Sequence, residues 1–477
     1  MDKLRPYQSE GIKKIFAEWR NGKRSVLFQM PTGTGKTILF SEIVKKGYEQ
    51  QKKILVIAHR KELVEQIQDK LKHYGVEAGI IMAGTESDSS KIVQIASIQT
   101  LSRRDNPEAN LIIIDECHHA KANSYAKLWS IYPNAKFLGV TATPIRSNGE
   151  GFDDLFEVLI PSMMISTFIE QGYLSRIKHF VCSHPNLRDV KQQRGDYIPQ
   201  MLKNVMIQDG IMGNIIESYV EKAWKKSTIV FAVDIEHSQT IVEQYKNIGI
   251  TAEHIDAKTP KTERNNIIAA FKRKEINVIS NVGIITEGFD FPECEVVQLA
   301  RPTKSLALYL QMTGRVMRTS KNKKYGLILD NAGLWVEHGQ STINRYWSLN
   351  SIKRNKNTAR FNYQFAALDK IRVGKKRPIE VEGLALIELP EERERLLIFE
   401  DFFQTADSKG YKLLSSYKAY KAYLMGKNSS ISKPEFEYIK ERLNKINSDY
   451  PEEKKFKSGF WFNEEMNLCK SNPDFRK

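Results

Sequence analysis

Short apolar runs constrain the fold of this chain more than any other feature, because they alternate with amphipathic stretches. An uninterrupted apolar run of strand length is typical of a strand buried on both faces. Residues 36–50 and 60–75 show helical spacing between such runs. The first series predicts a parallel α/β sheet within residues 1–175, with strands at residues 25–30, 53–58, 91–97, 111–115 and 136–142.

The same alternation returns further along the chain, without an evident sequence repeat. It predicts a second α/β domain over residues 176–340, with strands at residues 227–233, 251–255, 276–282, 294–300 and 325–330 and helices at residues 235–249, 260–273 and 305–318. The polar stretch at residues 184–200, between the two series, is interpreted as an interdomain linker, with a functional loop as the alternative.

The alternation stops near residue 341. The chain continues with the basic, Asn-rich stretch RYWSLNSIKRNKNTARFNYQ, after which apolar residues recur at helical spacing. Residues 341–477 are therefore predicted to form a mostly helical accessory region.

The charge of the chain indicates its partners. The formal net charge is +16 over 477 residues, with 41% hydrophobic and 27% charged residues, which is ordinary for a globular protein apart from the excess of positive charge. Such a balance favours a polyanionic partner, and nucleic acid is the commonest one. The alternative is a solvated basic surface.

Targeting features are not evident in the sequence. No apolar run approaches the length of a membrane span, and the first residues, MDKLRPYQSEG, are too polar for a secretion signal. The four cysteines, Cys117, Cys182, Cys294 and Cys469, lie far apart and form no CxxC pair. The sequence therefore predicts a protein of a reducing cytoplasm that has no membrane partner.

The stretch MPTGTGKT at residues 30–37 follows a predicted strand and opens a predicted helix, the context that a phosphate-binding loop requires. Gly33, Thr34 and Gly35 allow backbone N–H groups to approach phosphate oxygens. Lys36 can reach the β- and γ-phosphates, and the Thr37 hydroxyl can bind Mg²⁺. Met30 stands where the strict pattern has glycine, and a plain strand-to-helix turn is the alternative. ATP and Mg²⁺ are the expected ligands.

The stretch LIIIDECHHAK at residues 111–121 places acids at the end of a predicted strand. Asp115 is expected to bind Mg²⁺ through its carboxylate, and Glu116 to polarise the attacking water. A zinc site built on Cys117, His118 and His119 is the alternative, but adjacent residues cannot all point inward and no matching cysteine pair exists. His118 is expected to link the hydrolytic centre to a neighbouring loop, and His119 to pack or cap.

In this order the motifs resemble those of superfamily 2 helicases and translocases of the DEAD/DEAH type, here with a DECH box. The resemblance covers residues 1–340 and implies two tandem RecA-like parallel-sheet motor domains. Residues 4–8 resemble the adenine-side motif, so Gln8 would contact adenine with Arg5 nearby. Residues 58–63 and 96–101 resemble motifs whose Arg60, Gln99 and Thr100 would contact nucleic acid. Residues 141–144 resemble motif III, so Thr141 and Thr143 would couple the site to movement.

The second series supplies the remaining motifs. Residues 229–238 resemble motif IV, and residues 282–292 (VGIITEGFDFP) resemble motif V. The resemblance implies that Thr286 contacts the nucleic-acid backbone and that Gly288 and Asp290 face the nucleotide. Residues 311–318 (QMTGRVMR) resemble motif VI. There Gln311 would order the γ-phosphate region, and Arg315 and Arg318 would be arginine fingers.

The distribution of these residues has a mechanistic consequence. Phosphoryl transfer is catalysed largely by positioning and by charge stabilisation. If the phosphate loop and the arginines belong to different domains, hydrolysis requires the domains to close, and loss of the γ-phosphate releases them. One chain then suffices for one ATP site. A basic helix face is the alternative for Arg315 and Arg318.

Within the superfamily, the sequence looks most like the XPB-like branch, which includes bacterial and phage DNA helicases. Some relatives end in a cysteine-rich zinc module, for which this chain lacks the cysteines. Arg345, Tyr346, Trp347, Lys353, Arg354 and Phe361 are candidates for strand contacts, and Phe460, Trp461 and Phe462 form a second aromatic cluster. Burial in a core is the alternative for these aromatic residues.

Three functions follow from the sequence. The first is an ATP-dependent DNA helicase or translocase acting on forked, branched or duplex DNA. The second is an RNA-dependent helicase or the motor subunit of a restriction system. The third is a module that binds nucleic acid under the control of ATP. The complete hydrolytic set of Glu116, Arg315 and Arg318 favours an enzyme over the third alternative.

Overall fold

The computed structural model describes residues 4–86, 88–104, 106–119, 122–146, 150–182, 185–193, 195–285, 289–350 and 387–388. Thr286 and Gly288 lie outside these residues, as does most of the predicted accessory region, including the candidates from Lys353 to Phe462. The chain is divided into two compact units. The first unit comprises Met1–Thr342 and Trp347–Glu388 and contains both of the β-sheets described below. Among the described residues, no helix combines the length and the apolar character of a membrane span.

The first sheet has seven parallel strands in the order β3-β4-β2-β5-β6-β1-β7. Its strands are β1 (Ser25–Gln29), β2 (Ile54–Ala58), β3 (Ala78–Ile81), β4 (Val93–Ser97), β5 (Leu111–Asp115), β6 (Lys136–Thr141) and β7 (Val158–Pro161). The five predicted strands are all present, and every residue of β1, β2, β4 and β5 is buried. The prediction of a parallel sheet buried on both faces is therefore confirmed.

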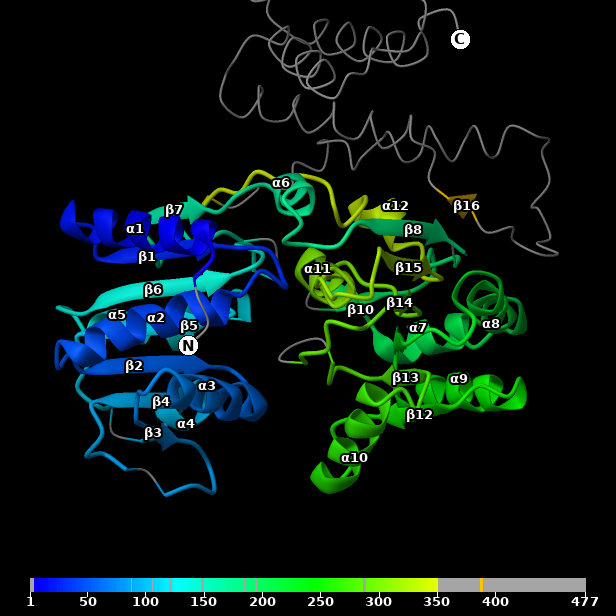
Figure 1. Ribbon diagram of the computed structural model, residues 1–477, viewed down its shortest axis with the longest axis horizontal. Coiled ribbons are helices and arrows are strands. Elements are labelled where there is room, and N and C mark those ends of the chain that lie inside the picture. Colours follow the sequence, from blue (N-terminus) through cyan, green and yellow to red (C-terminus); the bar gives the residue numbers. More distant parts are fainter. Residues whose placement is uncertain are drawn as a thin grey trace, which may run out of the picture. The chain divides into compact units, whose positions relative to one another are not determined.

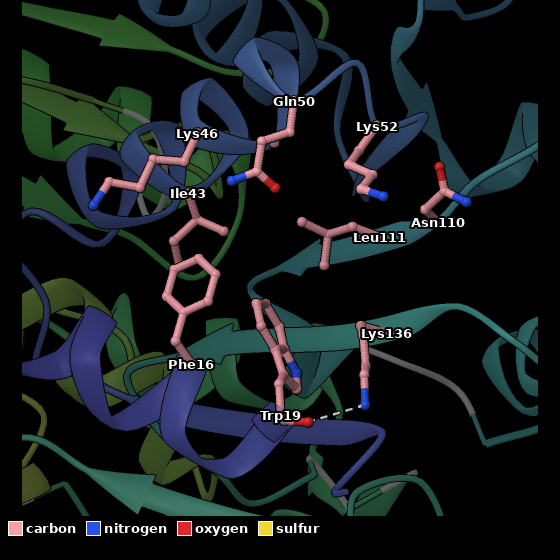
Figure 2. A pocket seen from close by; sticks show the side chains of 10 residues that line it. Phe16, Trp19, Ile43, Lys46, Gln50, Lys52, Asn110, Leu111 and Lys136 are labelled. Atoms are coloured by element: carbon pink, nitrogen blue, oxygen red, sulfur yellow. Dashed lines mark hydrogen bonds between the residues drawn. The ribbon is translucent and has the colours of Figure 1, made fainter. Parts of the chain in front are cut away.

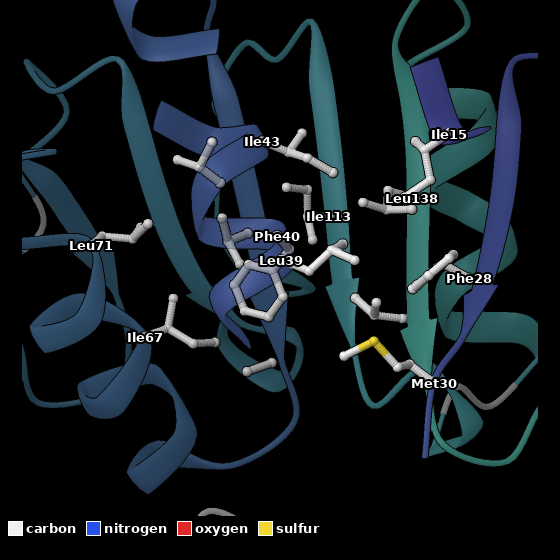
Figure 3. Packing of buried hydrophobic residues seen from close by; sticks show 14 of the residues in the cluster. Ile15, Phe28, Met30, Leu39, Phe40, Ile43, Ile67, Leu71, Ile113 and Leu138 are labelled. Carbon is white, nitrogen blue, oxygen red and sulfur yellow. The ribbon is translucent and has the colours of Figure 1, made fainter. Parts of the chain in front are cut away.

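Alternate residues of these strands pack into two different cores. Phe28, Ile113 and Leu138 face one core, which is shown in Figure 3 together with Ile15 of α1 and Leu39 of α2. The strand residues between them face a second core. The helices of this domain are α1 (Pro6–Arg20), α2 (Lys36–Glu49), α3 (Lys61–His73), α4 (Ile98–Leu101), the 3-10 helix Cys117–His119, α5 (Ala122–Ile131) and α6 (Ile165–Glu170).

The second sheet, drawn mainly in green in Figure 1, has the order β12-β13-β11-β14-β15-β8-β16. Its strands are β8 (Ile177–Val181), β11 (Thr228–Phe231), β12 (Ala252–Ile255), β13 (Val278–Asn281), β14 (Val296–Leu299), β15 (Gly326–Asp330) and β16 (Ile387–Glu388). Only β16 runs antiparallel to its neighbour. The second predicted α/β sheet is therefore also confirmed.

Helices again cover both faces of this sheet. Residues of α8 and α9 join one core, and residues of α10 and α11 join the other. The helices of this part of the chain are α7 (Pro199–Met206), α8 (Asp209–Ala223), α9 (Ile235–Asn247), α10 (Lys261–Lys272), α11 (Leu306–Gly314) and α12 (Leu334–His338).

Residues 184–200 differ from the linker interpretation. Strands β9 (Gln192–Gln193) and β10 (Asp196–Tyr197) form a small antiparallel hairpin, and α7 follows it. The Asp196 carboxylate accepts hydrogen bonds from the Thr303 hydroxyl at 2.7 Å and from the Lys304 backbone N–H at 2.8 Å. These two hydrogen bonds fix the hairpin to the segment that leads into α11.

The predicted helix over residues 305–318 is too long. Helix α11 ends at Gly314, and Arg315 occupies its C-cap. The backbone beyond it pairs instead with the connection between the sheets: Leu174 and Arg318 form an antiparallel bridge, and the Ser175 N–H donates to the Met317 carbonyl at 2.7 Å. Arg318 therefore extends from an irregular segment, and the basic helix face considered for it does not exist.

Candidate ATP site and nucleic-acid contacts

The phosphate loop, residues 31–37, connects the end of β1 to the start of α2. Gly33 has φ +86° and Gly35 has φ +91°, a left-handed conformation that glycine adopts without a Cβ clash. Lys36 and Thr37 are the first two residues of α2. Backbone N–H groups at a helix start favour an anion, so the local geometry suits a phosphate group.

The start of α1 holds this loop from outside. The Tyr7 hydroxyl donates to the Thr34 carbonyl at 2.7 Å, and Gln8 Nε2 lies 3.2 Å from the Gly35 carbonyl. Gln8 Oε1 also accepts the Arg5 backbone N–H at 2.9 Å. The amide expected to contact adenine thus also supports the phosphate loop, a contact that the sequence did not reveal.

Arg5 lies beside an aromatic cluster. Its guanidinium donates to the Tyr7 hydroxyl at 3.1 Å and lies 5.5 Å from the centre of the Tyr173 ring. The Tyr7 ring packs edge-on against Tyr173 and Phe168, each at 4.8 Å between ring centres. Tyr173 was not predicted, because it lies about 170 residues after Arg5 in the sequence and carries no motif of its own.

The two acids of the DECH box lie at the end of β5, and the Glu116 side chain faces the phosphate loop. Glu116 Oε1 is 3.3 Å from Lys36 Nζ, and both side chains are largely buried. Asp115 Oδ1 accepts the Glu116 backbone N–H at 3.0 Å. Glu116 has φ +46°, which is uncommon for a residue with a Cβ and is typical of strained positions at functional sites.

His118 connects the DECH box to motif III and to motif VI. Its Nδ1 lies 3.0 Å from the Thr141 hydroxyl and 3.3 Å from Glu116 Oε2. Its Nε2 lies 2.9 Å from Gln311 Nε2, on α11. Because a carboxylate only accepts, the network favours a proton on Nδ1 and an Nε2 that accepts from the Gln311 amide. Thr141 Oγ1 in turn donates to the Thr143 carbonyl at 3.1 Å.

The motif VI arginines meet at one carbonyl group of motif V. Arg315 Nη1 donates to the Phe289 carbonyl at 2.7 Å, and Arg318 Nη1 donates to the same oxygen. Arg318 Nη1 also lies 2.9 Å from Asp290 Oδ1. Both guanidinium groups are thus held by motif V, which fixes them relative to one another.

Motif VI also packs directly against the phosphate loop. A Cβ atom added at Gly33 would lie 3.1 Å from Arg318 Cγ, so the stem of Arg318 covers that glycine. A Cβ added at Gly314 would lie 2.5 Å from Thr32 Cγ2. Such a close approach explains why glycine stands at position 314.

The predicted nucleic-acid residues of the first sheet are only partly brought together. Gln99 Nε2 donates to the His59 carbonyl at 2.9 Å, which places it beside Arg60. Arg60 Nη1 donates to the Gly283 carbonyl of motif V at 2.7 Å. The Thr100 hydroxyl instead lies 3.0 Å from Ser97 Oγ, within its own helix cap.

Helices α3 and α10 meet beside these residues through exposed ion pairs. Lys261 Nζ lies 3.0 Å from Glu65, and Arg264 Nη2 lies 3.4 Å from Glu62. Exposed pairs of this kind contribute little at physiological salt. They nevertheless mark where the two sheets' helices contact each other.

Zinc is not supported at the DECH box. Cys117 is buried, and burial together with the neighbouring carboxylates raises the pKa of its thiol, which keeps it protonated. Within the described ranges, no group of three or more His, Cys, Asp or Glu side chains could hold a metal ion. The side chain of His119 lies outside those ranges.

The site fits a nucleotide and a magnesium ion by the chemistry of its donors. The Thr32 hydroxyl is buried and has no hydrogen-bond partner among the residues that the structure describes, so a phosphate oxygen could accept from it. The Thr37 hydroxyl and the Asp115 carboxylate offer the kind of oxygen atom that Mg²⁺ prefers, so they would hold the ion. When bound, the ion would neutralise charge on the phosphates.

A separate pocket of about 290 Å³ lies at the opposite edge of the first sheet (Figure 2). Leu111 and Lys136, which line it, begin β5 and β6, whereas Asp115 and Thr141 end those strands. The pocket is therefore not part of the ATP site. Its other lining residues are Phe16, Trp19, Ile43, Lys46, Gly47, Gln50, Lys52 and Asn110.

Comparison with known proteins agrees with this geometry. Residues 1–146 match the family model described as the res subunit of type III restriction enzymes, and residues 211–320 match the helicase conserved C-terminal domain. A 51.5 kDa protein of a Lactococcus phage is 34% identical over 321 residues, which cover 67% of this chain and 68% of that protein. The DNA 3'-5' translocase XPB2 of Sulfurisphaera tokodaii is 25% identical over 370 residues, which cover 69% of this chain and 81% of that protein.

Other relatives are longer, and this chain spans 51% and 57% of two helicase-named fungal proteins. A solved structure of the ATP-dependent type ISP restriction-modification enzyme LlaBIII bound to DNA has a TM-score of 0.53 and 19% identity, covering 69% of this chain and 28% of that one. This likeness shows the fold alone.

The phosphate loop and the DECH box of the first domain, together with motif VI of the second, define a two-domain motor ATPase of the helicase class. The chain belongs to superfamily 2 of the helicases, and it resembles the XPB-like branch.

Proposed function

We propose that the chain is an ATP-dependent DNA helicase or translocase that hydrolyses ATP with Mg²⁺ and remodels forked, branched or duplex DNA. One observation carries the proposal. Motif VI contacts the DECH box and the phosphate loop: Gln311 of α11 lies 2.9 Å from His118, and Arg318 covers Gly33. Residues 1–175 and 176–340 would then be the motor domains, and residues 341–477 the accessory region.

In the first domain, Lys36 and Glu116 would have the central roles. Their side chains lie 3.3 Å apart, so the Lys36 ammonium would leave Glu116 for the phosphates when ATP binds. Glu116 could then orient the attacking water as a general base. Thr37 and Asp115 would hold Mg²⁺, and Arg5 and Gln8 would lie on the adenine side.

In the second domain, the arginines would have to exchange partners. Arg315 and Arg318 now donate to the Phe289 carbonyl, and a γ-phosphate offers a more strongly charged acceptor. Positive charge placed there stabilises the transition state of phosphoryl transfer. Gln311 and His118 would report the state of the site to Thr141 and Thr143 of motif III.

The choice of DNA rests on charge and on relatives. The net charge of +16 suits a polyanion. In addition, a relative of which this chain covers 81% is named a DNA translocase. Arg60 and Gln99, with Thr286 of motif V, would contact the strand backbone. Arg60 would then exchange the Gly283 carbonyl for a phosphate.

Steady-state ATP hydrolysis tests the proposal. Turnover is measured without polymer and then with single-stranded, duplex and forked DNA and with RNA, at several salt concentrations. Stimulation by a DNA form that weakens with salt is the expected result. Stimulation by RNA alone would instead favour an RNA-dependent helicase. Slow turnover that no nucleic acid stimulates would instead favour a module that binds nucleic acid under the control of ATP.

A further inference from the structure

Lys323 lies in the turn between motif VI and β15, outside every motif considered so far. Its ammonium group donates to three backbone carbonyls: Pro292 at 2.7 Å, Cys294 at 3.0 Å and Val316 at 3.2 Å. A lysine ammonium has three N–H donors, so each one has an acceptor here.

The three carbonyls belong to the two segments that hold the arginines. Val316 lies between Arg315 and Arg318, and Pro292 closes motif V, three residues after Phe289. The arginines join these segments on one side, through the Phe289 carbonyl. Lys323 joins them a second time, through the carbonyls of Pro292 and Cys294 on one segment and the carbonyl of Val316 on the other.

The ammonium lies among few compensating charges. The negative charges of Glu293 and Glu295 favour the charged ammonium from a distance, and the positive charge of Arg318 disfavours it. Within the described part of the chain, no carboxylate lies within ion-pair distance of Lys323. Burial raises the pKa of the nearby Cys294 thiol to about 12, so that group stays neutral. Burial also lowers the pKa of Lys323 to about 8.

We propose that Lys323 is a positioning residue for the motif VI arginines, and that its charged form holds motif V and motif VI in register for ATP hydrolysis. The inference rests on the proposed function. A neutral amine has only two N–H donors and carries a lone pair, so it cannot serve three carbonyls. Turnover should therefore fall as pH rises through about 8, while ATP binding persists.

Stability should move in the opposite direction. Because the pKa of Lys323 in the folded chain lies below its ordinary value of 10.5, the unfolded chain binds more protons between about pH 8 and 10.5. The contribution of Lys323 to folding stability therefore rises with pH across this window. If Lys323 only stabilised the fold, turnover would not fall in the pH range in which the folding stability rises.

The test compares Lys323→Met, Lys323→Arg and the wild type by kcat and KM for DNA-stimulated ATP hydrolysis between about pH 6.5 and 9.5. Lys324→Met, at an exposed neighbouring position, is the matched control. Lys323→Met should lower kcat about tenfold, as expected for lost hydrogen bonds from a charged donor, and leave KM for ATP within about twofold. Lys323→Arg should keep turnover and lose the descending limb near pH 8, because a guanidinium stays charged.

Two results would overturn the inference: a Lys323→Met enzyme with wild-type kcat and pH profile, or a descending limb near pH 8 that persists in Lys323→Arg. If Lys323→Met does not fold, the inference is tested by comparing the pH profiles of turnover in Lys323→Arg and the wild type. Failure of the proposed function is a different result, since the wild type itself would then show no DNA-stimulated hydrolysis at neutral pH.

Discussion

The contact between Gly314 and Thr32 allows the shared ATP site to be tested with one methyl group. In Gly314→Ala the new Cβ would lie 2.5 Å from Thr32 Cγ2 and 2.6 Å from Thr32 Cβ. Carbon atoms in contact prefer about 3.5–4.0 Å, so the end of α11 and the phosphate loop must separate by roughly 1 Å. A misplacement of that size can cost about 100-fold in rate.

The substitution should not weaken the fold. Alanine is favoured over glycine in a helix interior by about 1 kcal/mol and by less at the last residue of α11, so the temperature of thermal unfolding should stay close to that of the wild type. The expected result is therefore a kcat for DNA-stimulated hydrolysis about 100-fold lower, with unchanged stability. Gly213→Ala in α8 is the matched control, because no atom lies within 4 Å of the added Cβ.

A second substitution provides the rescue. Thr32→Ser removes the Cγ2 atom that the new methyl group would meet and keeps the hydroxyl, so the double variant should recover part of the turnover lost in Gly314→Ala. Turnover of Gly314→Ala within about twofold of wild type would refute the reasoning. It would mean that motif VI does not approach the phosphate loop this closely in the working enzyme.

Three further predictions concern the same site. Lys36→Ala should weaken ATP binding and stop turnover, and near-normal hydrolysis would remove Lys36 from the site. Glu116→Gln should retain ATP and block the water step, as seen by nucleotide-binding and single-turnover assays; loss of ATP binding would make Glu116 structural. The effects of His118→Ala and Gln311→Ala on kcat should be non-additive, with a coupling energy of about 1 kcal/mol for a buried neutral hydrogen bond. Additive effects in the double-mutant cycle would show that the 2.9 Å contact between the two side chains is not made during turnover.

The central strands could be predicted because nearly all of their residues are buried, and most of these residues are apolar. Ile112, Ile113 and Ile114 face alternate cores, so the whole run had to be apolar. Short edge strands escaped prediction, since β3 and β7 are only partly buried. Strand β8 has a mixed burial pattern, and its place in the second sheet depends on pairing with β15, about 150 residues later.

The candidate site was predictable in its residue types but not in its contacts. Motif order placed Lys36 after β1 and Glu116 after β5, and the carboxyl ends of parallel strands lie at the same edge of a sheet, although β6 separates these two strands. The support from Gln8 and the three-carbonyl contact of Lys323 depend on long-range packing, which no local pattern encodes. The end of α11 was missed because motif VI is apolar at helical spacing beyond Gly314.

The connection between the sheets would make any rotation of the second domain move its parts by unequal distances. Ser175 Oγ donates to the Arg318 carbonyl at 2.9 Å, so Arg318 would lie close to the axis if the second sheet rotated about this segment. Strand β12 lies five positions from β8, roughly 24 Å at the usual strand spacing, and α10 follows it. A given swing would thus move α10 several times further than Arg318. A small displacement at the phosphates would be amplified into a long stroke on the side where Arg60 meets motif V.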